Sequence, residues 1–298
     1  MYAERLKPGE CIGIISPCHV GDPANYERIN AVLTRLGFTT KPGENLFKAT
    51  YGYEASIQER AADFNAMVAD DAVQMILFGG GEGAVEILPH LDYEKIRAHP
   101  KLIASFSDGT PILNAVYAQT GLVTYYGAGT TEFVDLRQYD YAQFCNNFVA
   151  GYEARQFISD SKWKILHAGI GEGIIIGGYA PEFAMLQSNR YFNFASDKKY
   201  LLILEDHEQF HVPEAMATFL GYLEQSPIMK NVTGLIFGQY AATENVILMG
   251  VLQRFGTRNN IPVVYTDDFG HGTKHGIFPL GQYGKLNTND ASLLFGGW

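Results

Sequence analysis

The stretch KLIASFSDGTPILNAVY, residues 101–117, runs from an apolar segment through a turn of small residues into a second apolar segment. Residues 101–105 predict a buried strand, because they form a short apolar run that ends at turn residues. Pro111 favours the start of a helix, since proline is tolerated in the first helical turn. A strand that leads into a helix is the repeating unit of α/β proteins. The stretch therefore predicts an α/β fold.

The same alternation extends to both sides of this stretch. Further strands are predicted at residues 11–16, 73–78 and 122–126, with helices between them. Ser56 and Glu59 have the spacing of a capping box at the start of one helix. Such alternation predicts a parallel sheet covered on both faces, with functional residues at the carboxyl ends of its strands.

The second half of the chain predicts a second, less regular α/β domain. Its strands are expected in the apolar runs KWKIL, GIIIGG, YLLIL, VTGLIF and IPVVY, and its helices at 213–225 and 243–255. Residues 134–163 are polar and aromatic, with a helix expected near 141–150, so we place the domain boundary between 150 and 168. The expected domains are residues 1–155 and a smaller mixed α/β domain of residues 165–298.

Composition excludes several classes of protein. The chain has 298 residues, of which 47% are hydrophobic, so it can bury a core and is not disordered. A net charge of −10 argues against nucleic acid and anionic membranes, which are bound by clustered Lys and Arg. Three cysteines predict neither a disulfide framework nor a thiolate zinc site. Without a signal-peptide pattern or an apolar run of about 18 residues, we expect a cytoplasmic location.

Ser107 lies in the SFSDGT turn between the predicted strand and helix. A serine in such a turn presents its hydroxyl at the sheet edge, as in the nucleophile elbow G-x-S-x-G, and the following backbone N–H groups point at the atom attacked. Alternatively, Ser107 or Asp108 only caps the helix. The hexapeptide alone leaves both interpretations open.

The glycines of GGGEGA, residues 79–84, allow three interpretations. They fit a degenerate dinucleotide motif, but no acidic residue ends the next strand, as that motif requires. They could instead bring the backbone close to a neighbouring strand end and supply an oxyanion N–H group. A plain tight turn is the third interpretation.

Two other segments contain reactive side chains in weaker settings. Cys18 and His19 follow the first strand, but adjacent residues of an extended segment point to opposite sides, so we expect Cys18 to be structural. HEQFH, residues 207–211, matches H-E-x-x-H literally, but that motif binds zinc only on a helix. Because the next helix is expected to begin at Pro213, we expect a chance match.

The second domain offers a carboxylate and an imidazole at strand ends. Glu205 and Asp206 follow YLLIL, and His271 lies between two glycines after VVYTDDF, with His275 as a weaker candidate. Solvated acids and loop histidines without a catalytic role are common. Together with Ser107, however, these residues provide the nucleophile, base and orienting acid of acyl transfer.

With these residues, the chain resembles the serine LD-carboxypeptidase family, which includes muropeptide carboxypeptidases and microcin C self-immunity peptidases. The resemblance runs nearly end to end. It is carried by LKPGECIGIISP (6–17), YGYEASIQERAADFNAMVAD (51–70), GGGEGAVEILPHLDY (79–93), PKLIASFSDGT (100–110), GLVTYYGAG (121–129), LLILEDHE (201–208) and FGHGTKHGIFPLG (269–281).

The resemblance implies a Ser-Glu-His triad of Ser107, Glu205 and His271, split between the two domains. It implies that the backbone N–H groups of Asp108 and Gly81 form the oxyanion hole. It also implies a Rossmann-like or flavodoxin-like parallel-sheet N-terminal domain, a homodimer and no cofactor or metal.

Several positions depart from the family pattern. Gly79 replaces an arginine found in many members, Ser105 replaces the leading glycine of the elbow, and Tyr179 replaces an asparagine after two glycines. Cys18 stands where the family has a serine. These departures are expected to affect substrate specificity rather than the reaction, since all three triad positions carry the residues that the family uses.

The resemblance predicts a hydrolase that cleaves an amide bond in a small peptide such as a murein tetrapeptide. Microcin-type peptidases, which cleave an aminoacyl or peptidyl nucleotide, are the alternative substrate class. A non-catalytic small-molecule binding protein is the alternative of another class.

Overall fold

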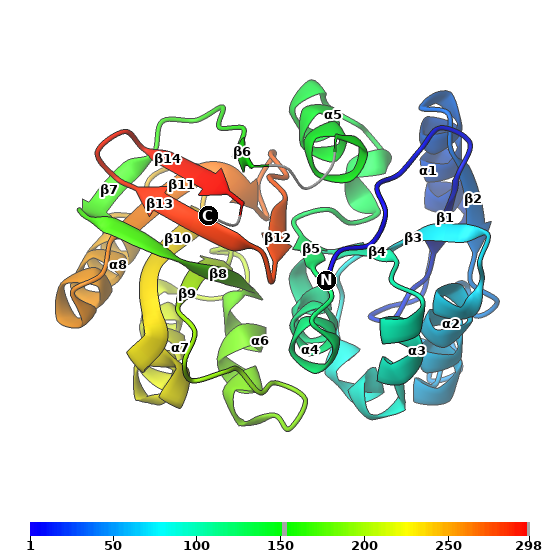
Figure 1. The fold of residues 1–298 in the computed structure, drawn as a ribbon, viewed down its shortest axis with the longest axis horizontal. Helices are drawn as coiled ribbons and strands as arrows, with labels where there is room; N and C mark the ends of the chain where they lie inside the picture. The colour runs from blue at the N-terminus through cyan, green and yellow to red at the C-terminus, as the bar shows by residue number, and fades with distance from the viewer. Residues whose placement is uncertain (151–153, 297–298) are drawn as a thin grey trace. The chain divides into compact units, whose positions relative to one another are not determined.

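The computed structural model describes residues 1–150 and 154–296, which divide into two compact units, Met1–Gly151 and Tyr152–Trp298 (Figure 1). Both units are α/β, as expected from the alternating sequence pattern. We propose residues 1–155 and 165–298 as the two folding domains.

The first unit contains a parallel sheet in the order β5-β4-β3-β1-β2. Strand order reverses between β1 and β3, and in open α/β sheets ligands bind at the carboxyl ends of the strands beside such a reversal. The strands are β1 (Cys11–Ile14), β2 (Thr39–Pro42), β3 (Val73–Leu77), β4 (Leu102–Ser105) and β5 (Thr124–Tyr126).

Helices cover both faces of this sheet. In Figure 1, α2, α3 and α4 lie along one face, and α1 and α5 lie on the other. The helices are α1 (Pro23–Arg35), α2 (Ile57–Ala69), α3 (Tyr93–Ala98), α4 (Thr110–Thr120) and α5 (Gln138–Phe144). Shorter turns of helix are η1 (Ala84–His90), η2 (Ser107–Gly109), η3 (Thr131–Phe133) and the π-helical η4 (Cys145–Val149).

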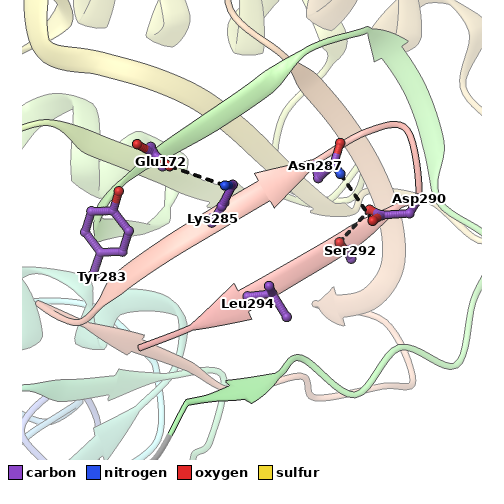
Figure 2. A pocket seen from close by; sticks show the side chains of 7 residues that line it. All are labelled: Glu172, Tyr283, Lys285, Asn287, Asp290, Ser292 and Leu294. Carbon is purple, nitrogen blue, oxygen red and sulfur yellow. Dashed lines mark hydrogen bonds and ion pairs between the residues drawn. The ribbon is translucent and has the colours of Figure 1, made fainter. Parts of the chain in front are cut away.

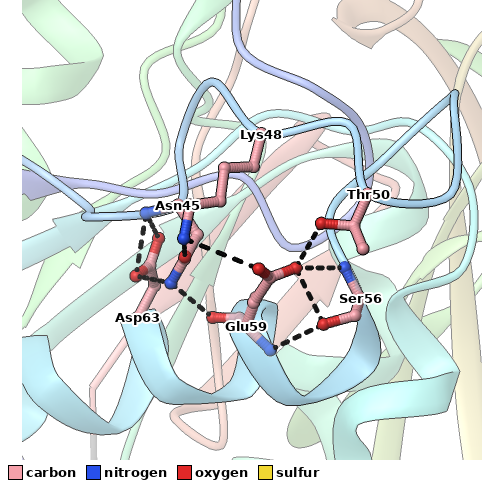
Figure 3. A network of polar contacts seen from close by, with 6 residues as sticks. All are labelled: Asn45, Lys48, Thr50, Ser56, Glu59 and Asp63. Carbon is pink, nitrogen blue, oxygen red and sulfur yellow. Dashed lines mark hydrogen bonds and ion pairs between the residues drawn. The ribbon is translucent and has the colours of Figure 1, made fainter.

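The predicted capping box starts α2 and belongs to a wider polar network (Figure 3). Glu59 accepts hydrogen bonds from the Ser56 backbone N–H at 2.9 Å and from the Thr50 hydroxyl at 2.5 Å. These bonds, first that from Thr50, lower the pKa of Glu59 to about 2. One turn further on, Asp63 accepts from the Asn45 side chain at 2.7 Å. The loop before α2 is therefore fastened to the helix at two points.

The second unit contains a mixed sheet in the order β6-β14-β13-β8-β9-β10-β11-β7. The central strands β8, β9, β10 and β11 are parallel, and the outer pairs are antiparallel. The strands are β6 (Arg155–Gln156), β7 (Lys164–His167), β8 (Ile170–Tyr179), β9 (Tyr200–Glu205), β10 (Val232–Gln239), β11 (Val263–Gly270), β13 (Tyr283–Asn287) and β14 (Ser292–Phe295); a short strand, β12 (Phe278–Leu280), lies between β11 and β13 in the chain.

Three helices of the second unit, α6, α7 and α8, lie side by side (Figure 1). They span Ala180–Met185, Pro213–Gln225 and Val246–Asn259, and the short 3-10 turns are η5 (Leu186–Ser188) and η6 (Pro227–Asn231). The helix expected at 243–255 begins three residues later, because the Asn245 side chain caps it by accepting from the Leu248 N–H. Across residues 1–150 and 154–296, no helix combines the length and apolar character that crossing a membrane requires.

Candidate functional site

Ser107 lies in a strained turn directly after β4. Its φ is +54°, and in residues 1–150 and 154–296 only two other non-glycine residues have a positive φ. A serine in this region costs on the order of 1–3 kcal/mol, so it persists only where surrounding contacts impose it. Here the Ser107 N–H donates to the Tyr126 hydroxyl at 3.1 Å, and the Ser107 carbonyl accepts from the Thr110 hydroxyl at 2.7 Å. The strand, strained serine and helix have the arrangement of a nucleophile elbow.

Asp108 connects the turn to the glycine loop. Its buried carboxylate accepts a hydrogen bond from the Ala84 N–H at 2.8 Å. This contact joins the segments that follow β4 and β3. The Asp108 carboxylate therefore binds the loop that follows β3. The N-cap residue of α4 is Gly109, which has no side chain with which to cap the helix.

The glycine loop packs against Ser107 and against the segment after β1. A Cβ added at Gly80 would lie 2.5 Å from the Ser107 Cβ, and one added at Gly81 would lie 2.2 Å from the Cys18 carbonyl oxygen. The Glu82 N–H also donates to that oxygen at 2.8 Å. The glycines lead into η1, a 3-10 turn that contains Pro89, rather than into a long α-helix. Close backbone approach therefore describes them better than a dinucleotide motif.

The side chain of Arg60 binds two of these loops. Its fully buried guanidinium donates to the carbonyls of Pro17 at 2.8 Å and Gly83 at 3.1 Å, and pairs with Glu54 and Glu86 at 3.1 and 2.5 Å. Sequence analysis missed this residue. The available signal was a charged residue on the buried face of α2, four positions before the core residue Phe64.

Cys18 is buried, as expected of a structural cysteine. Burial raises the pKa of its thiol well above the ordinary value, which disfavours the thiolate. Burial also lowers the pKa of the neighbouring His19. The structure thus supports the packing role over a nucleophilic one.

In the second unit, Glu205 and His271 form a direct pair. Glu205 ends β9 and is fully buried, and His271 follows Gly270, the last residue of β11. The His271 Nδ1 lies 2.6 Å from the Glu205 Oε2. A carboxylate there holds the proton on Nδ1, so that Nε2 can accept a proton, as a general base requires. Gly238 makes room for this pair, since a Cβ there would lie 2.9 Å from the Glu205 Cβ.

The adjacent residue, Asp206, contacts a different histidine, His211. Its buried carboxylate accepts from the His207 N–H at 2.8 Å and lies 3.2 Å from the His211 Nδ1. Burial raises the pKa of Asp206 to about 6. The geometry therefore distinguishes the two consecutive acids: Glu205 contacts His271, and Asp206 contacts His211.

The HEQFH segment is a turn rather than a helix. The N–H groups of Phe210 and His211 both donate to the His207 carbonyl, and α7 begins at Pro213. Throughout the described parts of the chain, no three His, Cys, Asp or Glu side chains form a group that could hold a metal ion. The helical face that a zinc-binding H-E-x-x-H requires is missing at this segment.

Aromatic rings enclose His271 on two sides. The ring centroid of Tyr179, the last residue of β8, lies 5.4 Å from that of His271, and the centroid of Phe210 lies 5.0 Å away. Burial, followed by the charges of Asp206 and Glu205, raises the pKa of the Tyr179 hydroxyl strongly, so that it stays protonated. Tyr179, a departure from the family pattern, thus contacts the candidate base.

A depression of about 420 Å³ lies on β8, β13 and β14 (Figure 2). Its polar side chains pair with one another: Lys285 lies 3.8 Å from Glu172, and Asp290 accepts from Asn287 and Ser292. None of the predicted site residues lines it. We therefore place the candidate site at the strand ends.

The five predicted site residues thus fall into two groups. Ser107, Asp108 and Gly81 lie at the strand ends of the first unit, and Glu205 and His271 form a hydrogen-bonded pair in the second.

Comparison with known proteins identifies the family. The LD-carboxypeptidase N-terminal domain (peptidase S66) matches residues 12–127, and the LD-carboxypeptidase C-terminal domain matches residues 172–286. A Bacillus subtilis protein provisionally named a murein peptide carboxypeptidase is 27% identical over 300 residues, covering 96% of this chain and 91% of the relative. The Escherichia coli microcin C7 self-immunity protein MccF is 36% identical over 131 residues, covering 43% of this chain and 38% of the relative.

Solved structures agree with this assignment. The crystal structure of an MccF-like protein from Bacillus anthracis superimposes with a TM-score of 0.91 at 25% identity, and the match covers 99% of each chain. The two matched family domains together span most of the sequence. This chain therefore belongs to the LD-carboxypeptidase family, peptidase S66, and is a hydrolase of the serine carboxypeptidase class.

Proposed function

We propose that this chain is an LD-carboxypeptidase-like serine peptidase that hydrolyses an amide bond in a small peptide such as a murein tetrapeptide. The observation that carries the proposal is the left-handed conformation of Ser107 in the turn between β4 and α4. Such strain in a non-glycine residue is concentrated at functional sites. The buried hydrogen bond between Glu205 and His271 supports it further.

In the proposed reaction, His271 takes the Ser107 hydroxyl proton while the Ser107 oxygen attacks an amide carbonyl beside a D-configured residue. The N–H groups of Asp108 and Gly81 stabilise the oxyanion, an interaction whose loss costs about 100- to 1,000-fold in rate per donor. The intermediate collapses, and the leaving amine takes the proton from His271. Water, deprotonated by His271, then attacks the acyl-enzyme. The second intermediate collapses and releases the acid, and the Ser107 oxygen takes the proton back from His271. Glu205 stabilises the imidazolium in both halves.

The test compares two serines of the same turn. Ser107→Ala is expected to abolish turnover of an LD-tetrapeptide and labelling by a fluorophosphonate probe. Ser105→Ala is the matched control, since the buried Ser105 hydroxyl makes long hydrogen bonds, to the Gly79 carbonyl at 3.4 Å and the Phe106 carbonyl at 3.5 Å. Near-normal turnover by folded Ser107→Ala protein would exclude Ser107 as the nucleophile.

Microcin-type hydrolysis of an aminoacyl or peptidyl nucleotide is the second candidate. The 36% identity to the microcin C7 self-immunity protein over 131 residues favours it. The same enzyme should be assayed with an LD-tetrapeptide and an aminoacyl-adenylate analogue, and the larger kcat/KM decides between them. A protein that neither turns over these compounds nor reacts with the probe would instead be a binding protein.

The proposal includes a homodimer in the cytoplasm, working without a cofactor. Light scattering at micromolar concentration tests the dimer, and fractionation of the source cells tests the location. A monomer in solution would remove the dimer from the proposal and leave the catalytic assignment standing.

A further inference from the structure

The segment Asp206–His211 forms a closed loop between β9 and α7, and we call it the 206–211 loop. The carboxylate of its first residue, Asp206, accepts from the His207 N–H at 2.8 Å and lies 3.2 Å from the Nδ1 of its last residue, His211. The buried Tyr240 adds two contacts: its carbonyl accepts from the Glu208 N–H at 2.9 Å, and its hydroxyl donates to the His211 carbonyl. Contacts at four of its six residues thus hold the loop closed.

The closed loop presents Phe210 to the ring of His271. The two ring centroids are 5.0 Å apart and meet edge to face, although Phe210 is 54% exposed. On another side, Tyr179 meets His271 at 5.4 Å and Phe210 at 6.4 Å. Because about half of the Phe210 ring stays exposed, hydrophobic burial contributes little to holding it in this position. The position of the ring therefore depends on the conformation of the 206–211 loop.

The hydrogen bond between the His271 Nδ1 and the Glu205 carboxylate fixes one edge of the imidazole. The rings of Phe210 and Tyr179 pack against the same imidazole and restrict rotation of its plane. The plane matters because Nε2 must point at the Ser107 hydroxyl, and a misplacement of about 1 Å can cost 100-fold in rate.

We infer that Asp206 and His211 are a positioning pair: they close the 206–211 loop so that Phe210 and Tyr179 hold the His271 ring in its catalytic plane. The inference rests on the proposed role of His271 as the base. It assigns a role to Asp206 and to the HEQFH segment, neither of which takes part in the proposed triad.

His211→Phe tests the pair, because it keeps a ring against Phe219, now 5.1 Å from His211, and removes Nδ1. We expect kcat to fall about tenfold with KM unchanged, as for the loss of one hydrogen bond to a charged group. Glu208→Gln is the matched control: it removes a charge from the same loop but keeps the backbone bond to Tyr240, and it should leave kcat unchanged.

Two further measurements separate positioning from general stability. The effects of His211→Phe and Phe210→Ala on kcat should not add, because both act on the same ring contact. Proton NMR of the His271 Nδ1–H, recorded without substrate, should show faster exchange with water in both variants and unchanged exchange in Glu208→Gln. Phe210 is exposed enough that its alanine variant should fold even if His211→Phe does not.

Additive effects on kcat, or unchanged exchange of the Nδ1–H in Phe210→Ala, would overturn the inference. Failure of the proposed function has a different signature. If Ser107→Ala stayed active, the triad would be wrong, while the exchange measurement would still report whether the loop holds His271.

Discussion

Replacing Gly80 by alanine is the sharpest test of how the first unit presents Ser107. Gly80 does not have a positive φ, so its backbone accepts alanine without strain, and the whole effect comes from the added methyl group. That methyl would lie 2.5 Å from the Ser107 Cβ. Ordinary van der Waals contact begins near 3.4 Å, so the serine or the loop must move by about 0.9 Å, the difference of the two distances.

Such a displacement has a predictable cost. A shift of about 1 Å at a reacting group costs on the order of 100-fold in rate, so kcat of Gly80→Ala should fall by about that factor. Overpacking of this kind also destabilises by about 1–3 kcal/mol, which the protein can tolerate while remaining folded. The measurements are kcat and KM with the best available substrate, the labelling rate with a fluorophosphonate, and the free energy of unfolding in urea.

Gly221→Ala is the control with the same chemical change. Gly221 lies within α7, and a Cβ there would meet no other atom within 4 Å. The control should keep kcat and raise the free energy of unfolding by roughly 0.5–1 kcal/mol, the usual gain from Gly to Ala inside a helix. A folded Gly80→Ala protein with normal kcat and normal labelling would refute either the close approach of Gly80 or the role of Ser107.

Three further predictions follow from the buried charges. Glu205→Gln should lower kcat roughly 1,000- to 10,000-fold with little change in KM, and a larger loss in Asp206→Asn would show that the orienting acid was misassigned. Folded Asp206 keeps its proton up to about pH 6, against an ordinary pKa of 3.8, so its contribution to stability falls as pH rises between these values, by about 3 kcal/mol. The unfolding free energy of Asp206→Asn relative to wild type should rise over that window, and a constant difference would contradict the raised pKa. Arg60→Met should destabilise by about 3–5 kcal/mol in urea, because it leaves Glu54 buried without its partner; a loss below 1 kcal/mol would show that the Arg60 ion pairs contribute little.

Elements with a strong local pattern were predictable from sequence. The helix expected at 213–225 is confirmed as α7, and the capping box at Ser56 and Glu59 is present with both hydrogen bonds. The edge strand β2 was missed because its residues are mostly exposed and give no apolar run. The β13–β14 hairpin was missed for a related reason: its strands alternate buried and half-exposed residues over short stretches.

The sequence by itself determined that Ser107, Glu205 and His271 follow predicted strands, because parallel strands ending at functional loops leave a local pattern of apolar runs and turns. Residue patterns alone left open which acid contacts which histidine; the family resemblance implied Glu205 for His271, and the tertiary structure shows both pairings. Glu205 and Asp206 are adjacent in the chain, but neighbouring side chains at a strand end point in different directions, so one contacts His271 and the other His211. The same holds for Arg60, whose partners Pro17 and Gly83 lie far away in the sequence and meet it only through packing.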